Sequence, residues 1–196
     1  SFPHITGTFG VPVDSIQWII IAYVLTYAAL LLGAGRFADV FGYRRMFITG
    51  LVINGLAMYG CASAQTFDAL VLARIGQGFG AALILSAGPA LITLSAPDSK
   101  RTQMIGTYTI AFGLAGASGP LIGGMMIDWL GWSGVFWFRI PIVLAGLILT
   151  VALAKEPSIK APSKGELDLT GIAGLVIGMT AALLAIGQAP RLGLDS

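Results

Sequence analysis

The chain has 196 residues, of which 56% are hydrophobic and only 10% are charged. An ordinary soluble domain has about 25% charged residues, so this chain lacks the polar surface that a water-soluble or a disordered protein needs. The formal net charge of +2 also excludes the basic surface that nucleic acid requires. The composition therefore predicts a protein of the lipid bilayer.

Apolar runs with almost no charged residues recur along the chain, each close to the roughly 20 residues that cross a hydrocarbon core of about 30 Å. Six such runs contain no Asp or Glu: 17–35, 46–64, 70–96, 104–127, 135–154 and 169–189. They lack the two-residue alternation of barrel strands, so they predict helices. The predicted fold class is an all-α, polytopic membrane helix bundle.

The basic residues predict the orientation, because Lys and Arg are held on the cytoplasmic side of a membrane. Eight of them fall in alternate breaks between the runs: Arg36, Arg44, Arg45, Lys100, Arg101, Lys155, Lys160 and Lys164. The four tryptophans gather at the opposite ends, where an outer aromatic belt would lie: Trp18, Trp129, Trp132 and Trp137.

This topology divides the chain into an outer stub at 1–16, five spans within 17–154, a cytoplasmic linker at 155–168, a further span at 169–190 and an outer end at 191–196. The opening segment SFPHITGTF has the character of a tail that follows a membrane crossing, so we expect a preceding helix to be missing.

The first cytoplasmic connection reads GAGRFADVFGYRRMF and holds one carboxylate, Asp39, beside the basic pair Arg44 and Arg45. The simpler interpretation is a tight turn at Gly35 and Gly42, with arginines that only mark the cytoplasmic side. The sharper one is a charge latch. In it, Asp39 pairs with a nearby arginine and with the positive N-terminal end of a helix in one conformation, and separates from them in another.

The run LVLARIGQGFGAA places Arg74 inside an apolar helix, where a central charge costs about 3 kcal/mol. Gln77 lies one turn further on the same face. Gly76 and Gly80 form a G-x-x-x-G pair that permits close helix contact, and Gly78 is expected to keep space open beside Arg74. The run predicts an open, polar-lined cavity, with snorkelling of Arg74 to the outer interface as the alternative.

Glycines are dense in the run GLAGASGPLIGG, in which Pro120 removes a backbone hydrogen bond in mid-membrane. Five glycines lie there: Gly113, Gly116, Gly119, Gly123 and Gly124. Packing alone commonly explains such a stripe. A Gly-Pro pair among five glycines further suggests a kinked, closely packed helix that bends or slides between states.

Residues for catalysis or metal binding are not arranged in any recognisable pattern. No spacing of His, Cys, Asp or Glu fits a metal site, and no Ser-His-Asp set or phosphate-binding loop occurs. His4, the only histidine, lies in the terminal stub, and Cys61, the only cysteine, lies in an apolar run where a packed small side chain is expected. We expect no enzyme activity, no metal and no cofactor.

Taken in order, the three motifs resemble those of the major facilitator superfamily, and specifically of its fourteen-helix drug:proton antiporters. The loop motif matches at Gly35, Ala38, Asp39, Gly42, Arg44 and Arg45; the fourth-helix motif matches at Leu70, Arg74, Gln77, Gly78, Gly80 and Ala82; the fifth-helix antiporter motif matches at Gly119, Pro120, Gly123 and Gly124. Val40 and Tyr43 stand where basic residues are common, which would weaken the latch, and Gly116 lies one place late beside Ala115. QWIIIAYVLTYAALL resembles the family's second helix, and SFP resembles the end of its first.

The resemblance implies the N-terminal bundle of this superfamily without its first helix. It also implies alternating access, in which two bundles rock about a central site and proton entry drives export of drugs or other small hydrophobic or cationic compounds. The implied roles are proton coupling for Arg74 and Gln77; a cytoplasmic gating latch for Gly35, Asp39, Gly42, Arg44 and Arg45; helix packing and a kink for Gly116, Gly119, Pro120, Gly123 and Gly124; and cavity lining for Tyr23, Thr26 and Gly78.

The implied partners are the lipid bilayer, protons, a small-molecule substrate and the missing C-terminal bundle of the same chain, with a proton gradient in place of a cofactor. The location that fits is a bacterial inner membrane, with residues 1–16 outside. The embedded acid that carries the proton in this subfamily is not in this chain.

Two other functions fit the same sequence less well. A metabolite importer or facilitator of the same superfamily would not need the Gly-Pro-rich fifth-helix motif. A non-transporting membrane sensor or scaffold with the same fold would not need to keep Arg74, Gln77 and Asp39 together. A membrane-embedded enzyme is a distant third, because it would need intramembrane acids, histidines or metal ligands.

Overall fold

The computed structural model describes residues 2–157 and, beyond them, residues 170–171, 173–174, 176–178 and 180–181. In chain order its elements are α1 (Phe2–Phe9), α2 (Val13–Phe41), α3 (Tyr43–Ala62), α4 (Phe67–Ser95), the short 3-10 helix η1 (Asp98–Lys100), α5 (Arg101–Leu130) and α6 (Gly134–Leu153). Within the described residues all regular structure is helical, so the predicted all-α fold is confirmed.

Among the described residues, five helical segments are long and apolar enough to cross a membrane. They are Ser15–Phe41, Tyr43–Ala62, Phe67–Ser95, Asp98–Leu130 and Gly134–Leu153. Each overlaps one of the first five predicted runs. Of the predicted sixth span only residues 170–171, 173–174, 176–178 and 180–181 are described, and these are helical. Most of the predicted linker and the side chain of His4 lie outside the described residues.

The helices extend further than the apolar runs that predicted them. The α2 helix has 29 residues, so it is about 43 Å long, which exceeds a hydrocarbon core of about 30 Å. Its cytoplasmic end includes Arg36 and Asp39, which the sequence had suggested for a loop. Charged residues mark where the hydrocarbon ends, but backbone hydrogen bonds continue the helix into the polar interface.

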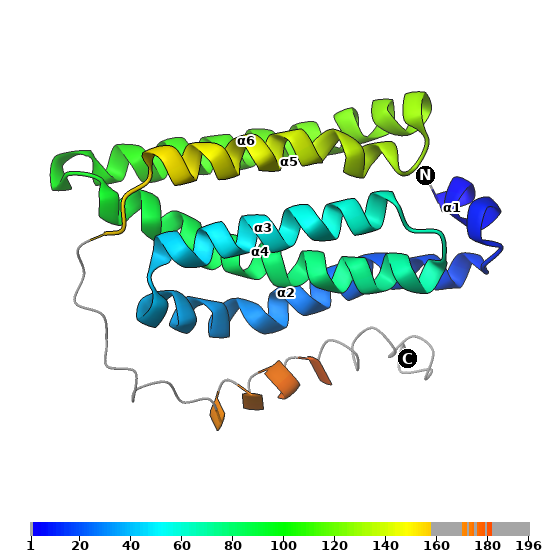
Figure 1. Ribbon diagram of the computed structural model, residues 1–196, viewed down its shortest axis with the longest axis horizontal. Helices are drawn as coiled ribbons and strands as arrows, with labels where there is room; N and C mark the ends of the chain where they lie inside the picture. The colour runs from blue at the N-terminus through cyan, green and yellow to red at the C-terminus, as the bar shows by residue number, and fades with distance from the viewer. Residues whose placement is uncertain (1, 158–169, 172, 175, 179, 182–196) are drawn as a thin grey trace, which may run out of the picture.

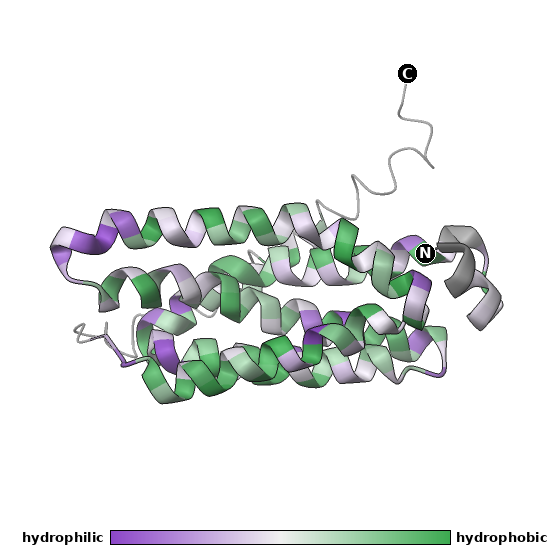
Figure 2. Cartoon of the chain, turned by 90° about the horizontal axis from the view of Figure 1, so that it is seen from above, coloured by the Kyte–Doolittle hydropathy of each residue, from purple (hydrophilic) through white to green (hydrophobic). Residues whose placement is uncertain are grey.

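The long helices run side by side, with α3 and α4 between α2 on one side and α5 with α6 on the other (Figure 1). The α4 helix packs extensively against both α2 and α3, and α6 packs against α3. Along their lengths the helices are mostly apolar or weakly polar (Figure 2). This arrangement makes α4 the central helix of the bundle.

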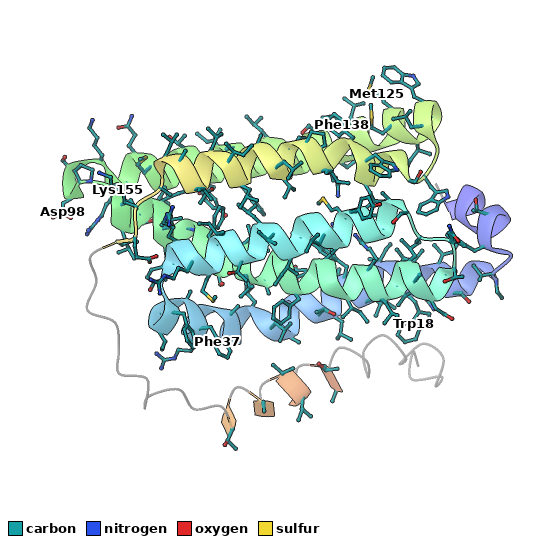
Figure 3. The ribbon with its side chains drawn as sticks, viewed as in Figure 1. Trp18, Phe37, Asp98, Met125, Phe138 and Lys155 are labelled. Atoms are coloured by element: carbon teal, nitrogen blue, oxygen red, sulfur yellow. The ribbon has the colours of Figure 1, made fainter. Side chains whose placement is uncertain are left out.

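The two ends of the bundle differ in the way the basic residues and tryptophans predict. Phe37, Asp98 and Lys155 lie at one end, and Trp18 lies toward the other (Figure 3). We name these ends cytoplasmic and outer after the orientation that the basic residues predict.

Apolar clusters at two levels hold the central helices together. The outer cluster contains Ile16, Ile19, Cys61 and Leu70, with Phe9, Trp132 and Phe136 packed against it. The second contains Ala34, Ala82 and Leu83. Cys61 is fully buried, as expected for a packed small side chain. The outer cluster lies beside the polar residues of α4 that the sequence singled out.

Candidate functional site

The start of α4 determines how deep its polar residues lie. Thr66 caps the helix, because its side-chain oxygen accepts a hydrogen bond from the Ala69 backbone N–H at 3.2 Å. Asp68 adds a negative charge to the first turn, which a helix N-terminus favours. Since α4 begins at Phe67, Arg74 lies about 10 Å along the helix at 1.5 Å per residue. The arginine is therefore inside a span.

The Arg74 guanidinium is held between α2 and α4. Its Nε donates to the Ile19 carbonyl oxygen at 3.0 Å, and a terminal nitrogen donates to Gln77 Oε1 at 2.6 Å. The guanidinium lies 4.6 Å from the centre of the Tyr23 ring and 6.0 Å from that of Phe136. Desolvated cation-π contacts contribute up to about 2 kcal/mol. These partners hold the charge inside the bundle, which differs from the snorkelling alternative.

Gln77 connects this arginine to α3. It is 3% exposed, and its backbone carbonyl accepts a hydrogen bond from Asn54 Nδ2 at 3.5 Å. Asn54 is also buried, and its Oδ1 has no hydrogen-bond partner among the described residues. Sequence reasoning missed Asn54, because no motif surrounds it; an amide in mid-span was the only signal. Arg74, Gln77 and Asn54 form a polar line across the bundle core.

Glycines of α4 permit close contact with α3. An added Cβ at Gly80 would lie 2.7 Å from the Asn54 backbone nitrogen, a distance that real Cβ atoms do not adopt. At Gly76 an added Cβ would lie 3.5 Å from the Ala57 Cβ, an ordinary contact. The close helix contact predicted from the G-x-x-x-G pair is confirmed. The contact requires glycine at position 80, whereas position 76 has room for a Cβ atom.

Gly78 makes the corresponding contact with α2. An added Cβ there would lie 2.7 Å from the Tyr23 carbonyl oxygen and 2.8 Å from the Thr26 Cβ. The expectation that Gly78 lines open space beside Arg74 is therefore wrong, because the α2 backbone fills that space. Tyr23 covers the guanidinium from α2, whereas the Thr26 hydroxyl donates to the Ala22 carbonyl oxygen of its own helix at 2.7 Å.

Asp39, at the cytoplasmic end of α2, has different partners from those predicted. Its Oδ1 accepts a hydrogen bond from the Tyr43 hydroxyl at 2.5 Å, and its Oδ2 lies 3.9 Å from an Arg36 terminal nitrogen. Among the described residues Asp39 forms no ion pair with Arg44 or Arg45, and the arginine beside it is Arg36. Because α2 remains helical through this segment, residues three apart share a face. Tyr43, which was expected to weaken the latch, instead donates a hydrogen bond to it.

Arg44 connects the α2–α3 turn to α6. Its Nε donates to the Ala154 carbonyl oxygen at 2.7 Å, and a terminal nitrogen donates to the Val151 carbonyl oxygen at 2.9 Å. A helix C-terminus leaves such carbonyls unpaired and favours a positive charge. The Glu156 carboxylate accepts from the Arg44 backbone N–H at 3.3 Å and would lie 2.8 Å from a Cβ at Gly42. Gly42 also has a φ of 97°, so this turn requires glycine.

We expect Arg44→Gln to destabilise the bundle by about 1 kcal/mol, because it removes charge-assisted hydrogen bonds to a helix C-terminus. Arg45→Gln is the matched control, since Arg45 is exposed and no hydrogen bond or ion pair of its side chain is found among the described residues. Thermal unfolding in detergent, followed by circular dichroism, compares the two. Equal loss of stability in both variants would contradict the assignment of Arg44 to α6.

The glycine stripe of α5 is not covered by another described helix. An added Cβ meets nothing within 4 Å at any of its five predicted glycines: Gly113, Gly116, Gly119, Gly123 and Gly124. The same is true at Gly35, in α2. Pro120 lies inside α5, which is continuous from Arg101 to Leu130 and has no buried residue. No described helix packs closely against this stripe, so the closely packed, kinked helix stays a prediction. On a separate point, the described part of the chain contains no group of three His, Cys, Asp or Glu side chains that could hold a metal ion.

A family model described as Major Facilitator Superfamily matches residues 1–190. The chain is 28% identical to the multidrug resistance protein Stp of Mycobacterium tuberculosis, over 100% of this chain and 36% of that protein. It is 32% identical to the cephamycin export protein CmcT of Amycolatopsis lactamdurans, over 96% of this chain and 39% of that protein. The chain thus spans less than half the length of these relatives.

The fold also resembles a solved structure, that of the human organic anion transporter MFSD10. The TM-score is 0.65 at 17% identity, and the match covers 91% of this chain and 43% of the other. At this identity the likeness concerns the fold alone, and it agrees with the arrangement of helices described above.

Proposed function

The chain belongs to the Major Facilitator Superfamily, and from that premise we propose that it is part of a secondary active transporter that exports small hydrophobic or cationic compounds in exchange for protons. The family consists of membrane transporters and not of enzymes. The proposal places the protein in a bacterial inner membrane, since the two relatives above are bacterial.

The observation that carries the proposal is the position of Arg74, which is half-buried between α2 and α4 inside a span. An arginine does not lose its proton in proteins, so Arg74 cannot itself carry a proton across the membrane. A fixed positive charge does change the pKa of a carboxyl group. The pKa is lowered when the two groups are close, and it returns toward its ordinary value when they separate. In an alternating-access cycle, Arg74 would therefore control when an acidic group elsewhere in the transporter binds and releases its proton.

Its partners suit this role. Ile19 and Gln77 hold the guanidinium by hydrogen bonds, and Tyr23 covers it from α2. The charge is therefore fixed in direction and partly shielded from water, which strengthens its effect on a neighbouring charge. The contacts with α2 and α4 also mean that a relative movement of these helices would shift the arginine.

The names of the two relatives support the direction of transport. One is a multidrug resistance protein and the other a cephamycin export protein. Export of unlike compounds by similar chains fits a broad, apolar substrate pocket.

Accumulation of ethidium, a fluorescent cation, in intact cells tests the proposal. Cells that express the protein from its complete reading frame should accumulate less dye than cells without it, and a protonophore should remove the difference. A difference that persists with the protonophore would contradict proton coupling. Higher accumulation in the expressing cells would point to uptake, as in an importer or facilitator.

We expect Asp39→Asn to slow turnover several-fold and to leave KM nearly unchanged. Asp39 is distant from Arg74 and contacts Arg36 and Tyr43 at the cytoplasmic end, so it acts on a conformational step. Asp98→Asn is the control, because Asp98 also pairs with an arginine three residues away, Arg101, at 2.9 Å, and lies outside the proposed latch. Initial rates at several substrate concentrations separate the two parameters; a raised KM with unchanged turnover would contradict the latch.

A further inference from the structure

Aromatic rings form a continuous series from the outer stub to Arg74. The centre of the Phe9 ring, at the end of α1, lies 5.3 Å from that of Trp132, in the turn between α5 and α6. The Trp132 ring meets the Phe136 ring of α6 edge to face at 6.4 Å. Phe136 in turn lies 6.0 Å from the Arg74 guanidinium. The series joins segments that are far apart in the sequence, at the end of the bundle where α1 lies beside the α5–α6 turn (Figure 1).

Two glycines fix the turn that carries Trp132. Gly131 has a φ of 74°, a left-handed conformation that other residues rarely adopt. An added Cβ at Gly134 would lie 2.5 Å from the Leu130 Cβ, so the start of α6 also requires glycine. The Gly134 backbone N–H donates to the Gly131 carbonyl oxygen at 3.1 Å, which closes the turn. The position of Trp132 is therefore set by the backbone on both sides of it.

The three rings cover the outer cluster. Phe9, Trp132 and Phe136 pack against it and are themselves half-buried, whereas Cys61 and Leu70 within the cluster are 0% exposed. The rings therefore separate the fully buried residues of the bundle from the outer surface.

The charge of Arg74 gives this cover a purpose. Arg74 lies only about 10 Å along α4 from the outer end of the helix. A charge within a membrane draws water toward itself by forming water-filled defects. Water at the guanidinium would raise the local dielectric constant and weaken the effect of Arg74 on neighbouring groups. Bulky apolar rings between Arg74 and the outer surface exclude that water.

We propose that Phe9, Trp132 and Phe136 form an outer seal over Arg74, and that Trp132 is the positioning residue that holds Phe136 against the guanidinium. The seal lies within one helix bundle, so it is separate from the rocking of two bundles against each other. Water and protons reach Arg74 from the outer side only when the α5–α6 turn moves away from α1. The part that concerns protons rests on the proposed function, whereas the seal itself does not.

Cys61 serves as the reporter of the seal, because it is the only cysteine of the 196 residues and is fully buried in the outer cluster. The protein is expressed from its complete reading frame, with any cysteine outside these residues changed to serine. Its reaction with MTSES, a small anionic thiol reagent that does not cross membranes, is followed in right-side-out and in inside-out vesicles. The unchanged protein should react slowly from both sides. Trp132→Ala should react several-fold faster from the outer side only, and Trp132→Phe should restore the slow reaction.

Two further variants make the labelling result specific. Trp129→Ala is the matched control, since Trp129 is 70% exposed and is not packed against the outer cluster, and it should not change the rate. Phe9→Ala removes the other side of the seal outside the membrane spans, and it should also accelerate the reaction from the outer side. If Trp132→Ala reacts faster from both sides, its fold is lost and Phe9→Ala decides. An unchanged outer rate in Phe9→Ala would then overturn the seal, as would unchanged rates in both variants.

Proton leak tests the part that rests on the proposed function. Vesicles with an imposed pH gradient and no substrate should lose the gradient several-fold faster with Trp132→Ala than with the unchanged protein or with Trp129→Ala. Equal decay, in a Trp132→Ala protein whose Cys61 has become accessible, would overturn the proton route. Failure of the proposed function has a different signature, namely dye accumulation by the unchanged protein that does not respond to a protonophore.

Discussion

Arg74→Ala should abolish proton-driven export while the protein remains folded in the membrane. Electrostatic and proton-transfer roles typically contribute about 100-fold or more to a rate, so we expect export at the level of membranes without the protein. The fold should survive because two energies nearly cancel. Removing an embedded charge relieves about 3 kcal/mol, and leaving the Gln77 amide without its partner costs roughly 1–3 kcal/mol. Transport and detergent-solubilised thermal stability are measured on the same preparation.

Two variants make this result specific. Arg74→Lys keeps the charge but cannot reproduce the two hydrogen bonds to Ile19 and Gln77 together, so it should restore export only in part. Arg101→Ala removes an arginine that pairs with Asp98 at the cytoplasmic end, and it should leave export unchanged. Normal export by Arg74→Ala would remove the arginine from the coupling mechanism.

Gly80→Ala and Gly78→Ala should each destabilise the bundle by about 2 kcal/mol, as overpacked cores do. The added methyl group would lie 2.7 Å from a backbone atom in both cases, on α3 for Gly80 and on α2 for Gly78. Backbone atoms cannot move aside as a flexible side chain can, so the helices themselves must separate. Unfolding of the purified protein in detergent, at increasing denaturant, measures the change in free energy.

Gly76→Ala is the matched control on the same helix. Its added Cβ would lie 3.5 Å from the Ala57 Cβ, an ordinary contact, and alanine favours a helix over glycine. We expect stability equal to or slightly above that of the unchanged protein. If Gly76→Ala were as destabilising as Gly80→Ala, the close approach of α3 and α4 would not be the cause.

Composition and charge were sufficient to predict the membrane bundle and the number of spans within residues 17–154, because both depend on local apolar length. They could not predict the partner of Asp39. The partner of Asp39 depends on α2 remaining helical past the end of its apolar run, because this places Arg36 on the same face of the helix. Arg44 instead donates to the C-terminus of α6. Glu156, which closes this contact, lies more than 100 residues away in the chain.

The glycine motifs also show what the sequence alone could not predict, namely whether a glycine-rich helix face is packed. Gly80 and Gly119 both belong to stripes typical of helix packing, yet the first is in close contact and the second borders an open groove. Spacing predicts that a face can pack; only the arrangement of the other helices shows whether it does. Asn54 was missed for a related reason. It belongs to the polar line of Arg74, Gln77 and Asn54 because it is buried beside Gln77, and no sequence motif marks that position.

Substrate uptake into inside-out vesicles tests the central claim most directly. The protein, expressed from its complete reading frame, is reconstituted with the cytoplasmic end facing outward, and the vesicle interior is made acidic. Proton exit should then drive ethidium into the vesicles, and substrate addition should raise the internal pH in step. Uptake that is indifferent to the pH gradient, with no change in internal pH, would contradict proton-coupled export.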